Sequence, residues 1–128
     1  MRLDSGRILA LAAGLLALAT LFGAFGAHAL NGRLPADRMG FYMTAVRYHF
    51  FNALGLLGVG LAARTMDCAL LRWAAALLLA GIVLFCGSLY GMSFEAPRAL
   101  GAITAVGGVA LLAGWALFAC AAWRTRQN

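Results

Sequence analysis

The sequence predicts an all-α membrane protein whose four antiparallel transmembrane helices form an up-down-up-down bundle. Its 128 residues are 64% hydrophobic and only 11% charged, and a soluble domain of this size keeps too much surface in water to hide that much apolar area. Four apolar runs approach the ~20 residues that cross a hydrocarbon core about 30 Å thick. The connectors between these runs are short, so neighbours in sequence are expected to pack antiparallel.

The charged residues exclude several classes of function. All ten basic residues are arginine, and only four acidic residues oppose them, for a net charge of +6. Nucleic-acid-binding proteins gather basic residues on a solvated face, whereas these arginines stand mostly between apolar runs, where they meet lipid headgroups. We therefore expect the lipid bilayer as a partner and no nucleic acid. The three cysteines have neither paired nor metal-site spacing, and we expect no metal and no cofactor.

The chain is expected to form one domain, residues 1–128, with spans at about 8–30, 39–63, 73–94 and 99–123. Asp4 and Ser5 are suited to cap the first helix, and Asn31-Gly32 to end it. Because every backbone group inside lipid must be bonded internally, we expect four uninterrupted helices.

The second span is the least regular of the four. Only sixteen residues separate Arg47 from Arg64, and they would rise only about 24 Å as a helix. This helix is therefore expected to begin near Asp37 or Met39 and to carry Arg47 inside it. Asp67 is predicted to cap the third helix. Pro97 suits the first turn of the fourth, where its missing N–H is not needed.

The distribution of arginines predicts the orientation. One side holds Arg2, Arg7, Arg64, Arg72, Arg124 and Arg126, and the other holds Arg33, Arg38, Arg47 and Arg98. The positive-inside rule then places both termini in the cytoplasm.

The N-terminus has a second interpretation. An apolar stretch follows Arg2 and Arg7 and ends in Ala27-His28-Ala29, a pattern that resembles a signal-peptidase site. The apolar run exceeds the about 7–15 residues of a signal-peptide core, so we expect the first span to be retained. N-terminal sequencing of the mature protein that began at Leu30 would contradict this.

Arg47 is the first candidate for a functional residue. If its helix enters lipid near Met39, Arg47 lies about 12 Å along the axis, and a charge at that depth is a functional hypothesis by default. In one interpretation its side chain simply reaches the phosphates, with Tyr48 in the aromatic belt. In the other, Arg47 anchors an anionic lipid or pairs with Glu95.

His28, His49 and Asn52 complete the candidate polar cluster with Arg47 and Tyr48. Asn52 is expected to bond across the bundle. The two histidines lie in the same half of adjacent helices and could ligate a haem, although histidines on bundle helices more often hydrogen-bond to a neighbouring helix. The spans contain no nucleophile paired with a base, so no catalytic residue is predicted.

Small residues recur at helical spacing, and we expect them to let the helices approach closely in lipid. The predicted packing positions are Gly23, Gly26, Gly87, Gly91, Thr104, Gly107, Gly108 and Gly114.

Several motifs, in the order in which they occur, resemble those of a known family. They are Gly23–Leu30 (GAFGAHAL), Thr44–Tyr48 (TAVRY), Phe85–Tyr90 (FCGSLY) and Leu100–Thr104 (LGAIT), the last followed by Gly107-Gly108 and Gly114-Trp115. The chain thereby resembles the small inner-membrane family called domain of unknown function 423, over nearly its whole length. Two residues depart from the family's pattern: Ala105 replaces a frequent proline, and Asn52 a common histidine. The resemblance implies a four-helix protein of the bacterial inner membrane, with relatives in mitochondria, and implies no activity.

The functional prediction follows from what the spans contain. No Asp or Glu lies within them, so the acidic relays typical of proton-coupled transport are absent. We expect a non-enzymatic bundle that serves as an accessory or assembly partner of other membrane subunits, or as a lipid-binding homo-oligomer. The alternatives are a small oligomeric transporter or channel, and a haem-binding redox protein that uses His28 and His49.

Overall fold

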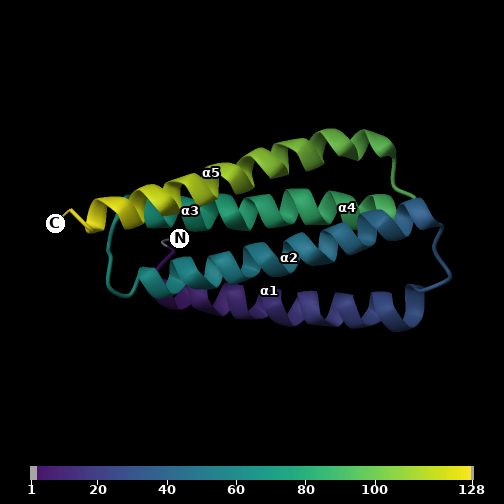
Figure 1. Cartoon of the computed structure of the whole chain (residues 1–128), viewed down its shortest axis with the longest axis horizontal. Coiled ribbons are helices and arrows are strands. Elements are labelled where there is room, and N and C mark those ends of the chain that lie inside the picture. The colour runs from purple at the N-terminus through teal and green to yellow at the C-terminus, as the bar shows by residue number, and fades with distance from the viewer. Residues whose placement is uncertain (1–2, 128) are drawn as a thin grey trace.

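The computed structural model describes residues 3–127 and consists of four continuous helices joined by short connectors (Figure 1). The helices are α1 (Ser5–Phe25) with the π-helical turn η1 (Gly26–Leu30); α2 (Ala36–Ala62); α3 (Ala69–Gly81) with the π-helical turn η2 (Ile82–Cys86) and α4 (Gly87–Ser93); and the 3₁₀ turn η3 (Arg98–Leu100) with α5 (Gly101–Thr125). Arg2, which entered the charge distribution above, lies outside the described residues.

The helices differ in how deeply they are buried. α1 packs along α2, α5 packs along α3 and η2, and α2 also contacts α3, η2 and α4. The centre of the molecule is therefore formed by α2 and by the helix that combines α3, η2 and α4, with α1 and α5 on the outside (Figure 1). The start of α1 and the end of α5 lie at the same end of the molecule (Figure 1). The outer helices leave much of their apolar surface uncovered.

The all-helical class is confirmed, and three of the four helices are long and apolar enough to cross a membrane. These are Ser5–Leu30, Ala69–Ser93 and Arg98–Thr125. α2 is as long as the others, with 27 residues, but Arg47, His49 and Asn52 make its middle less apolar. That α2 also crosses the membrane stays a prediction.

The first helix starts and ends as the sequence predicts. The carboxylate of Asp4 accepts a hydrogen bond from the backbone N–H of Arg7 at 2.9 Å, which caps α1. Gly32 has a φ of +78°, a conformation that glycine adopts without a steric penalty. α2 then begins at Ala36, one turn before Met39.

The predicted cap of the third helix is wrong. The residue that precedes α3 is Cys68, and its side chain makes no capping hydrogen bond. The Asp67 carboxylate instead binds the Arg72 guanidinium at 2.7 Å. Asp67 therefore stands one residue before the N-cap position, and its carboxylate is engaged by the side chain of Arg72.

The four helices are uninterrupted, as the sequence predicts, but two of them are not regular α-helices throughout. Two π-helical turns, η1 and η2, widen them at Gly26–Leu30 and Ile82–Cys86. Such turns are rare and keep the backbone groups bonded, so they satisfy the requirement of the membrane without a regular α-helix. Each lies at a tight contact: Gly26 of η1 is against Tyr42, and Phe85 of η2 is against Gly107.

The glycines make the closest helix contacts. A Cβ added at Gly107 would lie 2.4 Å from the backbone nitrogen of Phe85. At Gly114 the added atom would lie 2.9 Å from Leu78, and at Gly26 2.5 Å from Tyr42. At Gly107 the neighbour is backbone, so two helix backbones are in close contact there, whereas at Gly26 the neighbour is the Tyr42 side chain.

Other predicted packing positions are less constrained. An added Cβ would be in ordinary contact at Gly23 and Gly108, slightly tight at Gly91, and free of neighbours at Gly87. Three further glycines, which the spacing did not single out, are tightly packed: Gly55, Gly60 and Gly81.

Candidate functional site

His49 lies at the centre of a buried polar and aromatic cluster between α1, α2 and α4. Its side chain is 2% exposed, and its Nδ1 is 3.0 Å from the hydroxyl of Tyr90 on α4. The Phe22 ring of α1 meets it edge-on, with the ring centroids 6.2 Å apart. Nε2 is buried and has no hydrogen-bond partner within the described residues.

Tyr42 ties the same three helices together one level nearer the α1–α2 connector. Its hydroxyl donates to the Phe22 carbonyl, and its ring is edge-on to that of Tyr90, with centroids 5.4 Å apart. The aromatic rings here line a small, partly open apolar pocket of about 120 Å³. A space of this size holds no drug-sized ligand, for which pockets of about 300–1,000 Å³ are usual.

Asn52 bonds across the molecule, to α5. Its side-chain oxygen accepts a hydrogen bond from the indole N–H of Trp115 at 2.9 Å, and its amide donates to the Tyr48 carbonyl at 2.8 Å. The Trp115 ring lies so close to Gly55 that no side chain fits there. Both the oxygen and the nitrogen of the Asn52 side chain are thus engaged in hydrogen bonds within the protein.

A third polar contact joins α4 and α5. The hydroxyls of Ser88 and Thr104 share a hydrogen bond. Each is also within hydrogen-bond distance of a carbonyl of its own helix, that of Phe85 and that of Leu100 respectively. Because each hydroxyl has a single proton, one of the two donates to the other, and the accepting hydroxyl is free to donate to the carbonyl of its own helix.

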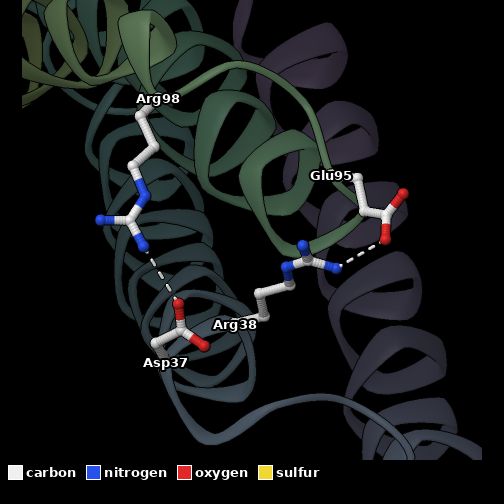
Figure 2. A network of polar contacts seen from close by, with 4 residues as sticks. All are labelled: Asp37, Arg38, Glu95 and Arg98. Carbon is white, nitrogen blue, oxygen red and sulfur yellow. Dashed lines mark hydrogen bonds and ion pairs between the residues drawn. The ribbon is translucent and has the colours of Figure 1, made fainter.

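Arg47 does not pair with Glu95, so that part of the prediction is wrong. The Arg47 side chain is exposed on the outer surface of α2, and the partner of Glu95 is Arg38, at 2.9 Å (Figure 2). Glu95 follows the end of α4 and meets the first turns of α2. Arg47 lies nine residues further along, about 14 Å away along the helix axis.

His28 and His49 are not brought together. His28 is exposed on η1, whereas His49 is buried between helices. A haem bound by both residues would need both imidazoles on one iron, and this geometry gives that alternative no support. Within residues 3–127, no three His, Cys, Asp or Glu side chains gather as metal ligands would.

The sequence comparison decides the family. The model of a family described as "Protein of unknown function (DUF423)" matches residues 22–108. The chain belongs to this family. Its relatives include UPF0382 membrane protein YwdK of Bacillus subtilis, which is 44% identical over 82% of this chain and 86% of its own length.

Two further relatives have similar names. UPF0382 membrane protein SERP0230 of Staphylococcus epidermidis is 45% identical over 73% of this chain and 75% of its own length. UPF0382 inner membrane protein YgdD of Escherichia coli K12 is 39% identical over 83% and 81%. No solved structure matches the chain significantly. The family and the three apolar helices make this a membrane protein, and the family carries no assigned activity.

The contacts that sequence reasoning missed are mostly aromatic. Tyr42, Tyr90 and Trp115 supply hydroxyl and indole groups to the interior. A signal was present, because aromatic residues with a polar atom usually find a partner when they are buried. Helical spacing alone does not say which helix supplies that partner.

Two ion pairs lie at the end of the molecule that carries the α1–α2 connector. Arg38 binds Glu95, and Arg98 binds Asp37 at 3.1 Å (Figure 2). Both pairs join α2 to the segment that follows α4. Because both pairs are partly exposed to solvent, we expect each to contribute at most about 1 kcal/mol to the free energy of unfolding.

We predict that Glu95→Gly is more stable than Glu95→Ala. Glu95 has a φ of 69° and follows α4 at a position where the next N–H, that of Ala96, bonds the Gly91 carbonyl at 3.1 Å. Glycine is the usual residue in this helix-ending conformation, and a side chain there costs about 1 kcal/mol.

Both variants lose the ion pair with Arg38, so the difference between their stabilities reports the cost of the positive φ at residue 95. Thermal unfolding in mild detergent measures it, and equal midpoints would contradict the prediction. Arg38→Gln, which removes the ion pair and leaves the backbone intact, is the matched control.

Proposed function

We propose that this protein is a four-span protein of the bacterial inner membrane that acts without catalysis, through its outer lipid-facing surface, as an accessory or assembly bundle. The observation that carries the proposal is the use of its interior polar groups. Among the described residues, every buried polar side chain makes at least one hydrogen bond within the protein, and His49 Nε2 is the one buried side-chain polar atom without a partner, which leaves little inside for chemistry or transport. The surface that remains for binding lipid or other membrane proteins is the apolar exterior.

The interior contacts support this step by step. His49 bonds Tyr90, Asn52 bonds Trp115, and Ser88 bonds Thr104. The fourth buried polar side chain, Ser93, donates to a carbonyl of its own helix. Polar contacts between helices are a usual means of helix association in lipid.

The position of the acids argues against the transporter or channel. Asp4, Asp37, Asp67 and Glu95 all lie at helix ends or in connectors. Proton-coupled transport relies on embedded ionisable groups that face a water-filled path. The one buried histidine instead sits among aromatic rings.

α2 fits the role of a fourth span. It packs along α1 and along the helix that combines α3, η2 and α4, two of the three helices with span length and composition. Its length of 27 residues corresponds to about 40 Å, enough for the hydrocarbon core and part of both interfaces. We infer that both termini face the cytoplasm, because more arginines lie on their side.

The orientation predicts which connector is accessible from each side. In a chain whose three cysteines are replaced by serine, Asn31→Cys should react with a membrane-impermeant maleimide added to the periplasmic side. Thr65→Cys should react only after the cytoplasmic side is opened. Both native side chains are exposed, in the α1–α2 and α2–α3 connectors. Labelling of both cysteines from one side would contradict the four-span topology.

Co-purification tests the proposed role. Extracted from native membrane in mild detergent and analysed by mass spectrometry, the protein should emerge in a complex larger than one chain, with other membrane subunits or with itself. A strict monomer with neither partner nor lipid would contradict the proposal. So would ion or solute flux in proteoliposomes that depended on Arg47 or His28, because that result would favour a transporter.

A further inference from the structure

An open apolar groove runs along the outer surface between α2 and α5. Its volume is about 530 Å³. Its walls include Tyr48 and Phe51 of α2, Phe85 of η2, and Gly108, Leu112 and Trp115 of α5. Phe51 is 59% exposed and Leu112 72% exposed, so the groove faces the surroundings and is not part of the core.

The groove exists because small residues face large ones across it. Gly108 and Ala105 contribute almost no bulk on the α5 side, and Phe85 lies in ordinary contact with Gly108. The indole of Trp115 is held toward α2 by its hydrogen bond to Asn52. The shape of the groove is thus set by contacts that do not need a ligand.

Arg47 adds a charge beside this apolar wall. It precedes Phe51 by four residues, so the two side chains lie on the same face of α2, with Arg47 one turn nearer the α1–α2 connector. Helical side chains tilt toward the helix N-terminus, which directs Arg47 toward the nearer headgroup layer.

No acid of this chain is left to neutralise Arg47. Each acidic residue has an arginine partner: Asp4 with Arg7, Asp37 with Arg98, Asp67 with Arg72, and Glu95 with Arg38. Within residues 3–127 the Arg47 side chain makes no hydrogen bond or ion pair. A charge at such depth is costly without a partner, so the counter-charge has to come from outside the chain.

We propose that the groove and Arg47 together bind one anionic phospholipid, with its phosphate on the Arg47 guanidinium and one acyl chain along the groove toward Trp115. This rests on the proposed function in one respect, that α2 spans the membrane. The planar guanidinium binds phosphate through two parallel hydrogen bonds. A zwitterionic headgroup has its own cation, which competes with Arg47 for the phosphate, so an anionic headgroup is preferred.

Tryptophan quenching by brominated lipids tests the proposal. Trp73→Phe and Trp123→Phe leave Trp115 as the only tryptophan of the three. The protein is reconstituted in vesicles of phosphatidylglycerol and phosphatidylcholine in equal amounts, with bromine on the acyl chains of one lipid at a time. We expect phosphatidylglycerol to be favoured at Trp115 by about fivefold, the typical effect of one arginine on an anionic lipid. Equal quenching by the two lipids would overturn the proposal.

Two pairs of variants separate the charge from the groove. Arg47→Gln should abolish the preference for phosphatidylglycerol, whereas Arg64→Gln, at the other end of α2, should leave it intact. Ala105→Phe should fill the groove and weaken quenching by both lipids. Ala102→Phe, on an exposed position of α5 outside the groove, should not.

If Arg47→Gln fails to fold, Arg47→Lys replaces it as the test variant. Lysine keeps the charge, so this variant should keep most of the preference for phosphatidylglycerol. A preference that survives in a folded Arg47→Gln, or that is lost equally in Arg47→Lys, would overturn the assignment. If the protein still co-purified in a complex but Trp115 showed no preference for phosphatidylglycerol, the lipid site would be wrong and the proposed function would stand. Failure of the maleimide labelling would remove the four-span proposal on which it rests.

Discussion

Gly107→Ala is expected to destabilise the protein by about 3 kcal/mol or more, the upper end of the cost of overpacking a core. The added Cβ would lie 2.4 Å from the backbone nitrogen of Phe85 and 2.8 Å from its Cα. A side chain can rotate away from such a contact, but a backbone cannot. The substitution must therefore push α5 away from η2 and disturb the adjacent contact between Ser88 and Thr104. Unfolding by SDS titration from mild detergent measures the loss.

The control for this variant is the next residue along the chain. A Cβ at Gly108 would be 3.7 Å from the Phe85 ring, an ordinary contact. Because alanine also favours a helix over glycine, Gly108→Ala should be neutral or slightly stabilising, within about 1 kcal/mol. If both variants unfolded at the same SDS fraction, the close approach at Gly107 would not be real.

Removal of the His49 imidazole is expected to cost about 1–3 kcal/mol, the usual penalty for leaving a buried polar group without its partner. In His49→Leu the Tyr90 hydroxyl loses the nitrogen that lies 3.0 Å away, in a place from which water is excluded. Tyr90→Phe removes the other member of the same contact. The double variant should then cost less than the sum of the two, by about 0.5–1.5 kcal/mol, as coupled neighbours do.

The same SDS titration measures all three variants. Tyr48→Phe is the matched control, because Tyr48 is on the same helix but is 42% exposed, and it should change stability by less than about 0.5 kcal/mol. Strictly additive effects of His49→Leu and Tyr90→Phe would show that the two side chains do not act as a pair.

Local chemistry explains which features were predictable. A helix start depends on a capping group within a few residues, and Asp4 provides one. A helix often ends at a residue that accepts a positive φ, and Gly32 does. The cap expected from Asp67 is absent because Cys68, one residue later, occupies the N-cap position of α3, and the Asp67 carboxylate binds Arg72.

The candidate site was predictable only in part. Asn52 was expected to bond another helix, and it does, but nothing in its surroundings along the chain identifies Trp115, 63 residues later. His28 and His49 looked like a pair because they lie in the same half of adjacent helices. Their side chains differ in exposure, since that depends on how each helix is rotated about its axis.

The sequence by itself determined the class of this protein. Its apolar runs, with arginines between them, indicate a membrane protein, and its motifs identify the family. Hydropathy and capping need only neighbours along the chain. The tertiary structure alone decided which charges meet. In the folded protein Glu95 pairs with Arg38, and Arg47 is exposed beside a groove. Ion pairing depends on where helix ends converge in space, and residues 57 positions apart can meet only after the helices have packed.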